Sequence, residues 1–173
     1  ESTAYYTQQI CASLSQLSSY LDWKVIDQVI QLIHDSDNVA FFGTQFSHSV
    51  ALHFQTDLLM LEKFTMAYME QTNQLQCAKE LDENSVAIIL TVSGHIFNGN
   101  QKMISYIKKS NAKVVIITND QDFDFGFEPD YVIGIGDPKY KRTGKHNLLT
   151  TMELMALRYY SIYYPDVKDN IIE

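Results

Sequence analysis

Two patterns of hydrophobic and polar positions alternate along the chain. One places apolar residues three and four positions apart, as in helices; the other is a short continuous apolar run, typical of a strand buried on both faces of a parallel sheet. The first pattern predicts helices over residues 4–20, 23–34, 47–61, 71–81, 101–109 and 148–163. The second predicts strands over residues 39–42, 64–68, 86–92, 114–118 and 131–135.

This alternation of strands and helices with short links predicts an α/β fold. We expect a three-layer α/β/α sandwich around a five-stranded parallel sheet of the flavodoxin-like order 2-1-3-4-5. Ligands of such sheets bind outside the carboxyl ends of the strands, where the strand order reverses. That point lies between the first and third strands, so the loops after these two strands are the predicted site.

Both loops combine hydroxyl side chains, a glycine and the start of a helix. Ser47 is a predicted N-cap after the first loop, and free amides at a helix start favour an anion such as a phosphate ester. Capping and tight turns need the same residue types, so each loop taken alone also fits a structural role. The predicted ligand-binding residues are Gly43, Thr44, Gln45, Ser47, Thr91, Ser93, Gly94 and His95.

The net charge and the cysteine content of the chain limit its binding partners and the cellular compartment in which it is expected. The formal net charge of −8 argues against direct binding of DNA or of a membrane, and we interpret the basic stretch 139–145 as a solvated loop. Cys11 and Cys77 lack the spacing of metal ligands and fit a reducing, cytoplasmic location. No apolar run reaches the length of a transmembrane helix, and no signal peptide is recognised at the start.

Acid–base chemistry has few candidates in this sequence. His48 and His95 follow the two predicted strands, and Glu153 lies in the last predicted helix, but none has a partner visible in the sequence. We therefore assign no catalytic residue. We also expect no metal and no cofactor, because His48 and His53 do not share a helical face and no G-x-G-x-x-G follows a strand.

A resemblance to a known family rests on three segments. The run Val39-Ala40-Phe41-Phe42-Gly43, with Ser47, Ala51 and Phe54, resembles the strand and G-x-G-x-S loop that open the sugar isomerase (SIS) domain. Residues 86–94 resemble its strand ending in S-x-S-G-x-T, and residues 114–118 are similar to its next strand. The helix at 23–34 is most like that of the RpiR-type transcription regulators, which join an N-terminal helix-turn-helix domain to a SIS domain.

The resemblance implies that loop hydroxyls and amides hold a sugar phosphate. Ser47, Ser93 and Gly94 match the family motifs, and Thr91 keeps a hydroxyl. Gln45 replaces a glycine and Ile96 replaces a threonine, which implies an altered or vestigial phosphate site, or a different effector that Gln45 and His95 contact.

The same resemblance sets the expected function. We expect a cytoplasmic, homodimeric effector domain of an RpiR-like transcription regulator, which senses a phosphosugar and reaches DNA through a domain absent from this chain. A start without Met suits such a C-terminal half, with residues 1–22 as a linker helix and 23–173 as the SIS domain. The alternatives are a sugar-phosphate isomerase and a SIS domain that acts only in dimerisation.

Overall fold

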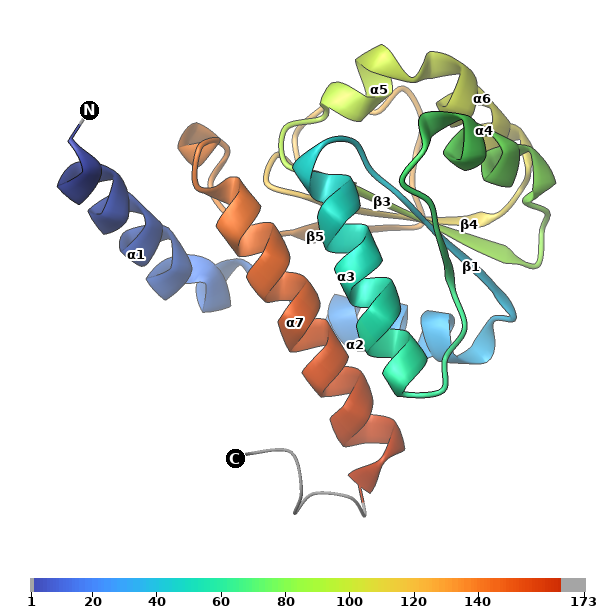
Figure 1. Cartoon of the computed structure of the whole chain (residues 1–173), viewed down its shortest axis with the longest axis horizontal. Coiled ribbons are helices and arrows are strands. Elements are labelled where there is room, and N and C mark those ends of the chain that lie inside the picture. Colours follow the sequence, from blue (N-terminus) through green and yellow to red (C-terminus); the bar gives the residue numbers. More distant parts are fainter. Residues whose placement is uncertain (1, 166–173) are drawn as a thin grey trace.

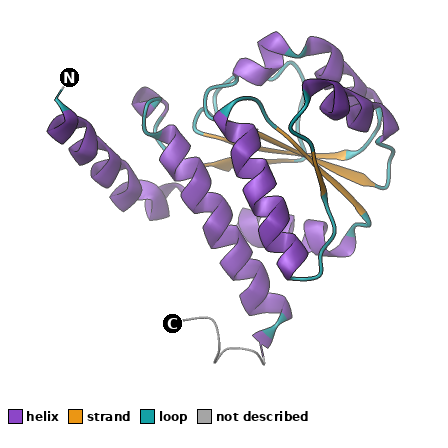
Figure 2. Ribbon diagram, in the orientation of Figure 1, coloured by secondary structure: helices purple, strands orange, loops and turns teal. Residues whose placement is uncertain are grey.

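The computed structural model describes residues 2–165 as three layers, with helices on both faces of a central sheet (Figures 1 and 2). The last eight residues of the predicted 23–173 domain, 166–173, lie outside the described part. The strands are β1 (Asn38–Phe42), β2 (Met66–Ala67), β3 (Ser85–Thr91), β4 (Lys113–Thr118) and β5 (Tyr131–Gly134). The helices are α1 (Thr3–Tyr20), α2 (Trp23–Asp35), α3 (Phe46–Met60), α4 (Gln71–Glu80), α5 (His95–Gly99), α6 (Gln101–Lys109) and α7 (Gly144–Tyr163), with a 3₁₀ turn, η1 (Pro138–Tyr140).

The sheet has five parallel strands in the order β2-β1-β3-β4-β5, which confirms the predicted order. Residues Asn38 to Phe42 of β1 pair in register with Ser85 to Ile89 of β3. The carboxyl ends of these two strands therefore lie side by side, and the strand order reverses between them.

Successive side chains along each strand point to opposite faces of the sheet and enter two separate cores. Val39 and Phe41 of β1 pack in one core with α2, α3 and α7. Ala40 and Phe42 pack in the other core with α4, α5 and α6. Burial on both faces explains why these strands read as continuous apolar runs rather than as an alternating pattern.

Local sequence signals account for several helix ends. The Asp22 carboxylate accepts hydrogen bonds from the amides of Lys24 and Val25 at 3.0 and 3.3 Å, so it caps the N-terminus of α2. The expectation that Ser47 caps α3 is wrong: α3 begins at Phe46, its N-cap is Gln45, and Ser47 is buried in the first turn. Because the chain turns tightly after Gly43, α3 begins at Phe46, before the serine that the sequence indicated as its cap.

The loop between β4 and β5 contains aspartates that alternate with aromatic residues. Asp122 and Asp124 are exposed to solvent. The aromatic rings between them turn inward onto Phe97 of α5, with centroid separations of 5.8, 5.1 and 6.4 Å for Phe123, Phe125 and Phe127. This packing fixes the loop against the start of α5.

Helix α1 lies beside α7 and projects from the layered body (Figure 1). Leu17 and Leu21 are buried in the core, and the Ser13 hydroxyl donates to Asn147 of α7 at 3.1 Å. Within residues 2–165, no helix combines the length and the apolar character that crossing a membrane requires.

Candidate functional site

The loop after β1 is held by the side chain of Gln74 in α4. The Gly43 amide donates to Gln74 Oε1 at 3.2 Å, and Gln74 Nε2 donates to the Gly43 carbonyl at 3.0 Å. A Cβ atom at Gly43 would lie 2.9 Å from the His48 amide nitrogen, closer than real Cβ contacts allow. Glycine is therefore needed here so that the chain can turn sharply into α3.

Gln45 adopts a backbone conformation that favours glycine. Its φ is +53° and its ψ is −123°, as at the first central residue of a type II′ turn. Such a conformation costs a residue with a side chain about 1–3 kcal/mol, and strained residues of this kind cluster at ligand sites. Gln45 stands where the SIS motif has a glycine. Its backbone nevertheless keeps the conformation that a glycine would adopt there.

A cavity of about 180 Å³ opens beside this loop. Its lining is mostly polar, contains no Asp, Glu, Lys or Arg, and includes one imidazole and one methionine: Gly43, Thr44, Gln45, His48, Met69, Gln71, Gln74 and Asn100. His48 Nδ1 lies 3.3 Å from the Gln45 carbonyl, whereas its buried Nε2 has no hydrogen-bond partner among the described residues.

The loop after β3 forms a second, separately braced turn. The Thr91 hydroxyl accepts a hydrogen bond from the Gly94 amide at 3.0 Å, and Gly94 has a φ of +76°. A Cβ atom at Gly94 would lie 2.5 Å from the Phe123 ring, so a side chain is excluded there. Ser93 Oγ and His95 Nδ1 lie 2.7 Å apart at the start of α5.

A buried polar network ties the carboxyl ends of the remaining strands together. The Asn119 amide donates to the Val92 carbonyl at 3.2 Å, and Asn119 Nδ2 donates to the Asp137 carbonyl at 2.8 Å. Asn147 Nδ2 donates to the Ile135 carbonyl at 2.8 Å. These bonds hold the loops after β3, β4 and β5 in one arrangement, because buried amides are costly to leave unpaired.

The predicted site residues fall into two groups. Gly43, Thr44 and Gln45 line the cavity, whereas Ser47 is buried in the first turn of α3 and does not line it. Thr91, Ser93, Gly94 and His95 belong to the neighbouring turn and do not line that cavity.

Several lining residues escaped the sequence analysis. Gln71 and Gln74 lie in α4, and Asn100 joins α5 to α6, where the three positions read as ordinary surface polar residues. The side chains of Gln71 and Asn100 are hydrogen-bonded to each other across this gap. The burial of Gln74 is the feature that distinguishes it from the other polar residues of α4. Because burial cannot be read from the sequence, no sequence signal pointed to these lining residues.

Acid–base side chains gather elsewhere, on the face formed by α3 and α7. His53 Nε2 lies 3.6 Å from Asp57 Oδ2 and 3.8 Å from Glu153 Oε1, and all three side chains are at least one-third exposed. These groups do not line the cavity at Gly43. Residues 2–165 contain no group of three or more His, Cys, Asp or Glu side chains arranged to hold a metal ion.

No protein-family model and no curated protein matches the sequence. Solved structures share the fold at low identity. The NanR protein of Vibrio vulnificus, complexed with ManNAc-6P, superposes with a TM-score of 0.78 at 15% identity over 94% of this chain. This chain spans 63% of the length of that protein.

Regulators and enzymes both occur among these structures. The sugar isomerase domain of an RpiR transcription factor from Sphaerobacter thermophilus gives a TM-score of 0.63 at 16% identity, covering 91% of this chain and 94% of that one. A phosphoheptose isomerase from Francisella tularensis gives 0.72 at 14% identity, covering 90% and 95%. The chain therefore has the SIS-domain fold, which these proteins use for different roles.

Proposed function

We propose that this chain, which has the sugar isomerase domain fold, is an effector domain that binds a sugar phosphate and belongs to an RpiR-like transcription regulator. The observation that carries the proposal is the backbone of Gln45. This residue is held at positive φ between the clamped Gly43 and the buried Ser47, at the point where the strand order reverses. A strained loop that the surrounding structure holds at a ligand crevice is typical of a binding site.

Uncharged donors would hold the ligand in this proposal. The eight predicted site residues contain no Lys or Arg, so hydroxyls, amides and imidazoles would contact the phosphate and the sugar. The cavity beside Thr44 would take hydroxyl or amide groups of the sugar. The Ser93–His95 pair would contact the phosphate from the adjacent turn.

A sensing role is favoured over isomerisation by the chemistry of the cavity. An aldose–ketose isomerase needs a base to move the substrate proton and an acid–base group to open the ring. Among the eight residues that line the cavity, His48 is the titratable one. The cluster of His53, Asp57 and Glu153 lies on the α3–α7 face instead.

Isomerase activity is the second candidate because an imidazole, that of His48, is among the residues that line the cavity. A neutral imidazole nitrogen in that position is able to accept a proton from a bound substrate. Turnover of a bound sugar phosphate that is lost in His48→Gln would favour the enzyme over the sensor.

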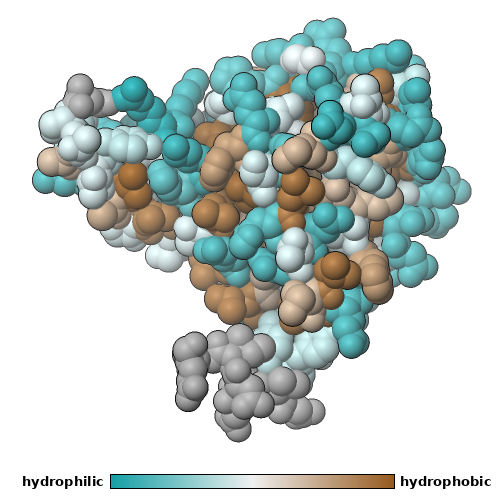
Figure 3. Space-filling model, viewed as in Figure 1, coloured by the Kyte–Doolittle hydropathy of each residue, from teal (hydrophilic) through white to brown (hydrophobic). Residues whose placement is uncertain are grey.

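Assembly and DNA contact complete the proposal. We propose residues 1–22 as the linker helix to a DNA-binding domain, since a chain with a net charge of −8 is a poor DNA ligand itself. Large apolar side chains are exposed at Leu59, Met60, Phe64 and Leu157, and Figure 3 shows apolar side chains gathered over α3 and α7. We propose this face as the homodimer contact, because such patches mark interaction surfaces.

Two tyrosines of α7 pack within the protomer, against His34. Tyr159 is 2% exposed and lies 2.8 Å from His34 Nδ1 through its hydroxyl, so it belongs to the core of the protomer. Tyr163 stacks on the same imidazole at 3.6 Å. The exposed aliphatic side chains are therefore the better dimer candidates.

Ligand binding is tested by a thermal-shift screen against hexose, pentose and heptose phosphates, including ManNAc-6P, with the unphosphorylated sugars beside them. A ligand at 100 times its dissociation constant adds about 2.7 kcal/mol to the free energy of unfolding and raises the melting temperature. We expect one sugar phosphate to stabilise the chain and its free sugar not to.

Two variants locate the site and one serves as the matched control. Thr44→Ala and Ser93→Ala should reduce the stabilisation by the sugar phosphate. Ser49→Ala should retain it, because Ser49 is exposed on α3 close to the same loop. The proposal fails if no phosphate ester stabilises the chain, or if the three variants behave alike.

A further inference from the structure

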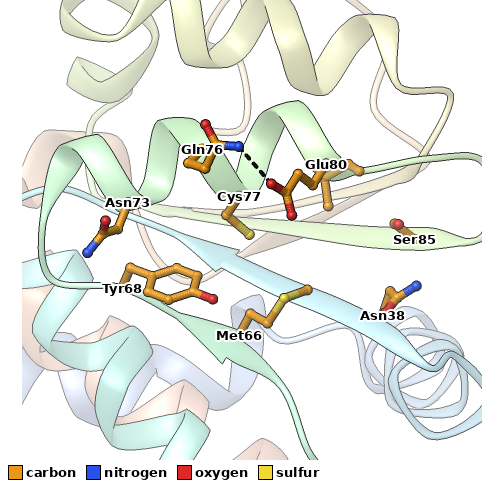
Figure 4. A pocket seen from close by; sticks show the side chains of 9 residues that line it. Asn38, Met66, Tyr68, Asn73, Gln76, Cys77, Glu80 and Ser85 are labelled. Carbon is orange, nitrogen blue, oxygen red and sulfur yellow. Dashed lines mark hydrogen bonds between the residues drawn. The ribbon is translucent and has the colours of Figure 1, made fainter.

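A second cavity, of about 340 Å³, lies between α4 and the sheet edge formed by β1 and β2 (Figure 4). We call it the α4–β2 pocket. Its lining residues come from both sides of that gap: Asn38, Met66, Tyr68, Asn73, Gln76, Cys77, Glu80, Leu81 and Ser85. The volume is within the range of small-molecule sites, which begins at about 300 Å³.

The pocket exists because β2 is short. Its two residues pair with Ala40 and Phe41 of β1, so the amino end of β1 at Asn38 has no strand beside it on that edge. Helix α4 extends over this gap and covers it from one face of the sheet (Figure 4). The result is a hollow rather than a packed edge.

This pocket is separate from the crevice at Gly43. Asn38 and Ser85 are the first residues of β1 and β3, whereas the crevice lies past the last residues of these strands. The five residues of β1, at about 3.3 Å each, lie between the two ends. The inference therefore does not rest on the function proposed for the crevice.

The lining has a definite chemical character. Glu80 is its one charged side chain, with no Lys, Arg or His among the nine lining residues. Gln76 Nε2 donates to Glu80 Oε1 at 2.7 Å, which uses one of about four acceptor positions on the carboxylate. Asn38, Asn73 and Tyr68 add neutral polar groups around it.

The remaining surface of the pocket is apolar. Met66, Leu81 and the Cys77 thiol lie beneath the polar groups, and Figure 4 shows Met66, Tyr68 and Cys77 converging on the same space. Burial raises the pKa of the Cys77 thiol to about 11, so this sulfur stays protonated and presents a neutral surface. Glu80 is exposed at the rim of the pocket, so an anion would meet its carboxylate without a compensating cation among the lining residues, whereas a cation would be attracted to it.

We infer that the α4–β2 pocket binds a small organic cation, a primary amine whose ammonium group pairs with Glu80 and whose apolar body lies against Met66, Tyr68 and Cys77. Charge-assisted hydrogen bonds from an ammonium to a carboxylate are stronger than neutral ones, which gives the amine its advantage over an alcohol of the same shape.

Helix α4 connects this pocket to the crevice. Gln71 and Gln74 line the crevice, while Cys77 and Glu80, further along the same helix, line the pocket. An amine in the pocket therefore contacts the helix that holds Gly43 in place.

The test follows methionine methyl resonances by NMR in the chain labelled with [methyl-13C]methionine. Met66 lines the pocket and Met69 lines the crevice, so the two residues report on the two sites separately. Met66→Leu and Met69→Leu assign the resonances. The probes are benzylamine, benzyl alcohol and benzoate, which share a ring and differ in charge.

We expect benzylamine to shift the Met66 resonance saturably and to leave Met69 little changed. Benzyl alcohol should bind at least about tenfold more weakly, and benzoate should not shift Met66. Glu80→Gln should weaken benzylamine about tenfold, while Glu83→Gln, an exposed neighbour outside the pocket, should keep the affinity of the original chain.

Three results would overturn the inference. The first is a Met66 resonance that benzylamine does not move, or moves only with Met69. The second is equal affinity for benzylamine and benzyl alcohol. The third is an equal effect of Glu80→Gln and Glu83→Gln, with circular dichroism confirming that both variants fold.

Discussion

The side chain of Gln74 binds both backbone polar groups of Gly43, at 3.2 Å to the amide and 3.0 Å to the carbonyl. The two residues lie 31 positions apart in the sequence. Through this contact, helix α4 determines the shape of the loop after β1. A residue that lines the crevice thus also positions the crevice backbone.

Replacing Gln74 with methionine should test this dependence. Gln74→Met keeps the length of the side chain and leaves two backbone groups of Gly43 without partners. Since each buried unpaired group costs about 1–3 kcal/mol, we expect the free energy of unfolding to fall by about 2–3 kcal/mol. Urea denaturation measures the loss.

The matched control is Gln76→Met on the exposed face of the same helix, with an expected change within about 0.5 kcal/mol. If the two substitutions cost the same, the clamp on Gly43 does not stabilise the fold.

Gln45→Gly should make the chain more stable. Relief of the positive φ returns about 1–3 kcal/mol, against a cost of about 0.5–1 kcal/mol for the greater freedom of glycine in the unfolded chain. We expect a net gain of about 1 kcal/mol, measured as a higher urea midpoint. Gln45→Ala keeps the strain and should give no such gain; an equal gain from alanine would point to the side chain rather than to φ.

Alanine substitutions at two glycines with similar φ angles distinguish the cost of backbone strain from the cost of a steric clash. Gly94 and Gly126 have φ of +76° and +73°, but only a Cβ atom at Gly94 would meet another residue, the Phe123 ring at 2.5 Å. Gly126→Ala should cost about 1–2 kcal/mol for the left-handed conformation alone. Gly94→Ala should cost at least about 1 kcal/mol more, because the ring must move. Equal melting temperatures of the two variants would contradict this packing.

The ion pair between α2 and α7 should make a small contribution that depends on pH. Arg158 Nε and Nη2 donate to the two Asp27 oxygens at 2.9 and 2.8 Å, and these hydrogen bonds lower the pKa of the Asp27 carboxyl from its usual value of 3.8. A lowered folded-state pKa gives stability that is present above the unfolded value and is lost as the pH falls through the folded value.

The substitution Asp27→Asn measures this contribution. Because both side chains are more than one-third exposed, we expect a loss of less than about 1 kcal/mol at about pH 7. The difference from the original chain should shrink as the pH falls below about 4. Asp122→Asn, in the exposed loop after β4, should show no loss; a loss from Asp27→Asn that is constant with pH would exclude the ion pair as its cause.

Sequence patterns were sufficient for the layers and for the strand order of this fold. The apolar runs at 39–42 and 86–92 were correctly predicted as strands buried on both faces, and the two cores formed with α4–α6 and with α2, α3 and α7 explain why they lack polar positions. Strand β2 was predicted over 64–68 but spans Met66–Ala67. It is an edge strand that pairs with β1 alone, so its length depends on the neighbouring strand rather than on its own apolar residues.

What the sequence by itself determined is the periodicity of each element, and with it the fold and the two loops at the reversal of strand order. The tertiary structure alone decided which side chains surround those loops. Gln74 and Asn100 reach the first loop from α4 and from the α5–α6 junction, and Gln45 is forced into positive φ by the turn between Gly43 and α3. The physical reason is that periodicity depends on neighbouring residues, whereas a cavity is made by side chains that only the packing of distant helices brings together.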